Sequence, residues 1–152
     1  MAYLEQSLEG TLVDALTAVS GTVPVYGYLT PASERKRTCT LVKTSPRKQR
    51  STNIPVTDVE ATVTVMASEE DCDSSDLLAQ MADPICNKLE SLEKDIDATS
   101  DALSTDTYRV DGFQFSGGES PAYDQQALIW YMVLQCTFSG VILYPAVVET
   151  GE

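Results

Sequence analysis

The spacing of apolar residues predicts two amphipathic helices, over residues 3–19 and 73–96. In each segment apolar side chains recur about one helical turn apart, which gives each helix one stripe to bury. The stripes consist of Leu4, Leu8, Leu12, Leu16 and Val19 in the first helix, and Leu78, Met81, Ile85, Leu89, Leu92 and Ile96 in the second. Because Pro84 lacks a backbone N–H, we expect the second helix to kink or restart there. Residues 97–106 are polar and indicate a linker.

Alternation of apolar and polar residues indicates a strand over residues 57–67. Its apolar face consists of Val59, Ala61, Val63, Val65 and Ala67. Residues 23–30, 37–44 and 108–115 are rich in β-branched and aromatic side chains and are also expected to be strands. We expect the first of them at a sheet edge, because Pro24 cannot donate a ladder hydrogen bond.

Two irregularities in the strand patterns carry information. The apolar parity of residues 108–115 changes at Asp111-Gly112, which indicates a bulge or a tight turn. After a loop at 117–126, residues 127–139 are apolar on both faces in their first half. One face carries Leu128, Trp130, Met132, Leu134, Cys136 and Phe138, and the other carries Ile129, Tyr131 and Val133. Such a strand is either central and covered on both sides, or it meets another subunit. We therefore predict a subunit interface at Ile129, Tyr131 and Val133.

These elements predict one α+β domain over residues 1–140, followed by a tail at 141–152. Each helix has one apolar stripe, and the sheet needs one face covered. All three apolar surfaces are buried when both helices pack on the same side of the sheet. The expected fold is a mostly antiparallel sheet of four to five strands with two helices on one face. A projecting basic loop at 31–55 completes this architecture.

Positive charge is concentrated in one stretch of the chain. Seven of the ten Lys and Arg residues fall within residues 35–50, which contain no acidic residue, although the chain has a net charge of −13. This concentration indicates contact with DNA or with an acidic protein surface, and the alternative is a solvated loop. The candidate contact residues are Arg35, Lys36, Arg37, Lys43, Arg47, Lys48 and Arg50.

The sequence argues against catalysis. It contains no histidine, which removes the usual general base and the commonest metal ligand. It has no phosphate-binding glycine motif, and the acidic residues 69–73 lack the spacing of a calcium loop. We expect no enzymatic activity, no cofactor and no metal. A monomeric nucleic-acid-binding module is a further alternative, but aromatic residues are not interleaved with the cations and the net charge opposes binding.

The remaining features concern location and redox state. The N-terminus lacks the pattern of a signal peptide, and no apolar run is long enough to cross a membrane, so we expect folding in the cytosol without membrane contact. The four cysteines, Cys39, Cys72, Cys86 and Cys136, form no CxxC pair. We expect them to be reduced thiols that pack as small apolar side chains.

The order and pattern of these segments resemble the tail terminator, or tail completion, proteins of long-tailed bacteriophages. The resemblance spans residues 3–140 and lies in a leading helix, VPVYGYLTP with CTLVKT, VEATVTVMA followed by LLAQMADPICNKLESL, and a closing YRVDGFQFSG with ALIWYMVLQCTFSG. It implies a virion subunit, assembled in the bacterial cytoplasm, that forms a ring, commonly a hexamer. The ring would cap the tail tube at the head–tail junction and contact tail tube and neck or connector proteins. A head–tail connector or stopper subunit is the alternative.

In such a ring the basic residues would face either DNA in the channel or an acidic rim of the adjoining ring. A channel that bound DNA strongly would hinder its exit, so we favour docking to a protein partner. Because virus particles reach an oxidising environment, Cys39 is also a candidate for an intermolecular disulfide.

Overall fold

The computed structural model describes residues 4–21, 23–28, 30–45, 48–49, 56–72, 74–105 and 108–142. Within these residues the helices are α1 (Leu4–Thr17), α2 (Ser75–Lys94) and α3 (Ile96–Leu103), with a short 3₁₀ helix, η1 (Ala32–Glu34). The strands are β1 (Val25–Gly27), β2 (Cys39–Thr44), β3 (Lys48–Gln49), β4 (Val56–Ser68), β5 (Tyr108–Gly118), β6 (Ala122–Asp124) and β7 (Ile129–Ile142).

The strands form one sheet in the order β1-β2-β4-β7-β5, with β3 paired to β4 and β6 paired to β7. Strand β1 runs parallel to β2, and the other pairs are antiparallel. The predicted α+β class with a mostly antiparallel sheet is confirmed, and β1 lies at an edge as Pro24 indicated. The short strands β3 and β6 raise the count above the expected four to five, and β6 lies in the predicted loop 117–126.

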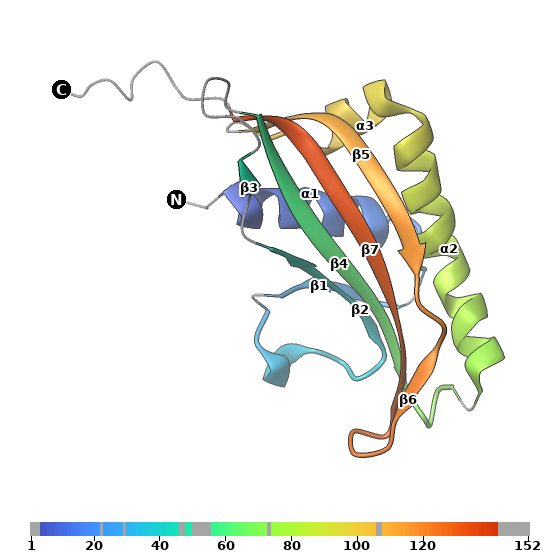
Figure 1. The fold of residues 1–152 in the computed structure, drawn as a ribbon. Coiled ribbons are helices and arrows are strands. Elements are labelled where there is room, and N and C mark those ends of the chain that lie inside the picture. Colours follow the sequence, from blue (N-terminus) through green and yellow to red (C-terminus); the bar gives the residue numbers. More distant parts are fainter. Residues whose placement is uncertain are drawn as a thin grey trace.

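The helices cover one face of this sheet (Figure 1). Val59, Ala61, Val63, Val65 and Ala67 of β4 are at most 1% exposed, as their alternation predicted. They share a core with α1, α2, α3 and the inward residues of β5 and β7; the helix members include Leu8, Leu12, Leu16, Leu78, Ile85, Leu89 and Leu103. On the opposite face no α-helix of the described residues covers the sheet (Figure 1).

The second helical region differs from the prediction at its break. Helix α2 runs unbroken through Pro84, which lies on its exposed side, so a restart at Pro84 is wrong. The break comes at Asp95, whose side chain accepts a hydrogen bond of 3.2 Å from the N–H of Ala98 and caps α3. Residues 97–106 are therefore not simply a linker. Helix α3 lies there and buries Thr99 and Leu103, which are one helical turn apart. A single pair of this spacing is too short a pattern to predict a helix from the sequence.

Glu9 is another departure, because it lies on the expected polar side of α1 yet is only 7% exposed. Its carboxylate accepts backbone hydrogen bonds from Tyr28 at 3.1 Å and from Thr44 at 3.4 Å. These residues follow β1 and end β2, so Glu9 binds donors at the ends of two parallel strands. A Cβ on Gly27 would lie 2.6 Å from its Oε2, so a larger residue there would push the carboxylate away from these donors.

Candidate assembly surface

The predicted interface residues lie together on the helix-free face of the sheet. Register places Val133 beside Thr64 and Leu41, and Tyr131 beside Met66 and Cys39. Leu41 in turn is paired with Tyr26 of β1. We call the partly exposed apolar side chains of this region the apolar patch; it consists of Tyr26, Leu41, Met66, Ile129, Tyr131 and Val133. Ile129, Tyr131 and Val133 are thus joined by three side chains from other strands.

Sequence reasoning missed these three residues because their membership depends on strand register. Met66 belongs to the outward face of the alternating strand, where its neighbours are polar. Tyr26 and Leu41 lie in segments expected to be strands, but the face of a short strand is defined only once its partner is known. Pairing of Leu41 with Thr64 and of Cys39 with Met66 supplies that information.

The other half of the same face is polar. Ser139 donates a hydrogen bond of 3.0 Å to Asp58, and Thr62 donates one of 3.3 Å to Gln135. The helix-free face is therefore divided along its strands, with polar residues toward β3 and apolar residues toward β6. A surface of this kind suits a partner that covers only its apolar half.

The structure distributes the candidate cations over separate places rather than one arm. Arg35, Lys36 and Arg37 follow η1, Lys43 lies in β2 and Lys48 in β3, so the predicted loop 31–55 contains two strands. Arg47 and Arg50 lie outside the described residues.

Two of these cations have partners in their own chain. Arg37 donates to the backbone carbonyls of Ala127 and, at 3.3 Å, Leu128. The Nζ of Lys43 lies 4.6 Å from the ring centre of Tyr28, a cation–π distance. Lys36 is exposed, and the Nε of Arg35 is buried without a hydrogen-bond partner among the described residues. The cations near η1 therefore brace the fold as well as exposing charge.

Arg37 holds the tip of the hairpin formed by β6 and β7. The carboxylate of Asp124 accepts hydrogen bonds from the N–H groups of Gln126 at 3.0 Å and Ala127 at 3.1 Å, which builds the turn. Leu128 then has a φ of 58° and is 43% exposed. The alternation predicts Leu128 on the face of Trp130, but β7 begins only at Ile129. A bulky residue at positive φ carries about 1 kcal/mol of backbone strain, so the contacts of the turn must stabilise this conformation of Leu128.

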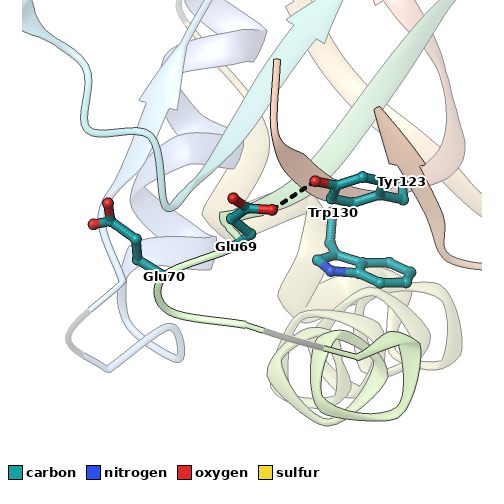
Figure 2. Close-up of a pocket in the computed structure, with 4 residues that line it drawn as sticks. All are labelled: Glu69, Glu70, Tyr123 and Trp130. Carbon is teal, nitrogen blue, oxygen red and sulfur yellow. Dashed lines mark hydrogen bonds between the residues drawn. The ribbon is translucent and has the colours of Figure 1, made fainter. Parts of the chain in front are cut away.

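A cleft of about 490 Å³ lies beside this hairpin, lined by Glu69, Glu70, Tyr123 and Trp130. Figure 2 shows the hydroxyl of Tyr123 directed at Glu69, to which it donates a hydrogen bond of 2.6 Å. This bond raises the pKa of Tyr123. The rings of Tyr123 and Trp130 have centroids 5.1 Å apart and are tilted by 51°. Sequence reasoning missed the cleft because Tyr123 lies in the unrecognised strand β6, far along the chain from Glu69.

The four cysteines are free, as expected. Cys39 is 1% exposed, and its burial raises the pKa of the thiol, so the predicted intermolecular disulfide does not fit this fold. The described residues contain no cluster of three or more Cys, Asp or Glu side chains that could hold a metal ion. No helix of the described chain is both long and apolar enough to cross a membrane.

Comparison with known proteins shows a likeness of fold. No family model and no curated protein matches the sequence. Among solved structures, one chain from the virion of a native gene transfer agent particle has a similar fold, with a TM-score of 0.51 and 16% sequence identity. The alignment covers 92% of the present chain and 99% of that virion chain. The two proteins therefore share an architecture over almost their whole lengths.

Proposed function

We propose that this protein is a structural subunit of a phage-type virion, and that it acts as a tail terminator. In this role its copies form a ring that caps the tail tube and joins it to the neck at the head–tail junction. The observation that carries the virion assignment is the fold shared with nearly all of a chain from a gene transfer agent virion. The order of helices and strands, which resembles tail terminators, supports the finer role. The role requires no catalysis, and we propose that the protein is not an enzyme.

The apolar patch supports self-association through the helix-free face. The apolar patch draws on four strands and lies on the face that no α-helix of the described residues covers. Its members are Tyr26, Leu41, Met66, Ile129, Tyr131 and Val133. Contiguous exposed apolar side chains bordered by polar ones commonly mark protein–protein contacts. The polar half of the face, with Asp58 and Gln135, then forms the rim.

The test is the size and binding partner of the purified protein. Light scattering coupled to gel filtration should give a closed oligomer, and electron micrographs should show rings. Mixed with isolated tail tubes, the rings should sit on tube ends. A species that stays at the 16.5 kDa of the single chain, both alone and with tubes, would refute the ring. Rings that bind the head connector but not tube ends would instead support a connector or stopper.

A further inference from the structure

The cleft beside the β6–β7 hairpin has the chemistry of a cation-binding site. Glu69 and Glu70 are exposed, and neither forms an ion pair with a described residue. Figure 2 shows the Glu69 carboxylate turned toward the hydroxyl of Tyr123, with the indole of Trp130 nearby. Carboxylates pair with lysine or arginine, and aromatic faces attract the same cations. The apolar stem of such a side chain would also pack against the rings.

Three of the described cations of the same chain have partners outside the cleft. Arg37 lies near Tyr123, but its guanidinium donates to the carbonyls of Ala127 and Leu128. Lys43 lies over the ring of Tyr28. Arg109 pairs with Asp111 at 3.0 Å. The cleft is therefore built for a positive charge that these residues do not supply.

Lys48 lies at the opposite end of the sheet from the cleft. Lys48 is paired with Asp58 near the start of β4, whereas Glu69 comes directly after Ser68 at its end. Roughly 33 Å of strand separates the two positions, which no side chain can span. Arg47 and Arg50 lie within two residues of Lys48 in the sequence, in a chain whose net charge is −13. The charge on one end of the subunit thus complements the cleft on the other end.

We propose that the cleft of one subunit receives a cationic side chain from residues 45–55 of a second copy of the chain. This inference rests on the proposed ring and names one of its contacts. Contact between opposite ends of two identical subunits is head-to-tail, and such contacts close into rings when the rotation between subunits allows it.

Binding in the cleft can be measured directly, because Trp130 is the only tryptophan of the chain. The full-length variant with Arg47, Lys48 and Arg50 replaced by serine cannot fill the cleft itself. Titrating it with a synthetic peptide of residues 45–55, SPRKQRSTNIP, should change the fluorescence of Trp130 in a saturable way. A peptide with the same three residues replaced by serine should give no change. Absence of any response to the native peptide would overturn the proposal.

Variants of the cleft show whether the peptide binds there. Adding E69Q/E70Q should weaken binding about tenfold or more, because charge-assisted bonds are lost. Adding D97N/D101N, which removes two exposed carboxylates from α3, should leave the affinity unchanged. Y123F removes the hydroxyl bonded to Glu69, and its affinity for the peptide should lie between those of the other two variants. Equal affinity in all of them would overturn the proposal.

The same variants separate this proposal from the ring itself. If the wild-type chain forms rings, E69Q/E70Q and the triple serine variant should lose them, and D97N/D101N should keep them. Rings that persist in the first two variants would overturn the cleft contact and leave the proposed function intact. A wild-type chain that forms no oligomer would refute the ring, and peptide binding would still test the cleft.

Discussion

The hydroxyl of Tyr108 on β5 donates a hydrogen bond of 2.6 Å to the carbonyl oxygen of Thr57 on β4, across the intervening strand β7. Both residues are fully buried. The tyrosine ring passes over Gly140 of β7, where a Cβ would lie 2.8 Å from its Cζ. This contact ties together three strands near the end of the sheet that carries β3 (Figure 1).

Replacing Tyr108 by phenylalanine tests the contribution of this hydrogen bond. Y108F keeps the ring but leaves a buried carbonyl with one partner fewer, so we expect a loss of about 1–2 kcal/mol in unfolding free energy. Chemical denaturation measures it. T57V is the contrasting change, because the Thr57 hydroxyl is buried without a partner among the described residues. It keeps the carbonyl acceptor and should be neutral or stabilising; a large loss there would show that the hydroxyl is satisfied.

Gly140 should tolerate no side chain. In G140A the new Cβ would lie 2.1 Å from the carbonyl oxygen of Arg109, which is backbone and cannot rotate away. We expect a loss of about 3 kcal/mol or more in thermal or chemical unfolding. G10A is the matched control, because Gly10 lies inside α1 and a Cβ added there would meet nothing within 4 Å. It should stabilise the protein by about 0.5–1 kcal/mol, and a similar effect of both variants would contradict the packing argument.

Much of this architecture follows from periodicity, and the exceptions share a cause. The alternation from Val59 to Ala67 was sufficient to predict a strand, and the parity change at Asp111 was sufficient to predict an irregularity, because each pattern depends only on neighbours in the sequence. The structure confirms the irregularity as a register shift between Val110 and Gly112. The burial of Glu9 and the role of Gly140 depend on strands brought together from distant parts of the chain. No local pattern encodes such contacts.

The residues of the candidate site also fall into those that local sequence predicts and those that only the strand pairing reveals. Ile129, Tyr131 and Val133 could be predicted as interface residues because apolarity on both faces is visible along one strand. Their neighbours Leu41 and Met66 required the register of β2 and β4. The cleft required recognition of β6, a strand of three residues whose pattern is too short to detect.

Burial of Cys136 predicts a loss of stability at high pH. Burial, and to a lesser extent Cys86 and Glu93, raise the pKa of its thiol from 9.0 to about 12. Above pH 9 the unfolded thiol ionises while the native thiol stays neutral, so its stabilising contribution is present below pH 9 and is lost as the pH rises to 12. The loss amounts to at most about 4 kcal/mol. Unfolding free energy should fall less steeply with pH in C136A than in wild type; parallel curves would contradict the assignment.

Tyr131 allows the fold and the proposed ring to be tested separately. Its side chain lies on the helix-free face and is only partly buried, so an aspartate there can be hydrated in the free subunit. We expect Y131D to keep the wild-type circular dichroism spectrum and to change unfolding free energy by no more than about 1 kcal/mol. In a subunit interface the same carboxylate would be desolvated without a partner, which opposes assembly. Light scattering should therefore show a single chain where the wild type forms rings.

The control for Y131D lies on the same strand and the same face. Gln135 is exposed and belongs to the polar half, beside Thr62, so Q135D adds the same charge outside the apolar patch. Rings should survive Q135D, because a rim charge stays hydrated and affects the rate of association more than its strength. Rings that persist in Y131D would remove the apolar patch from the interface. An unfolded Y131D chain would show that this face belongs to the core of the subunit, because only a buried site converts one added charge into loss of the fold.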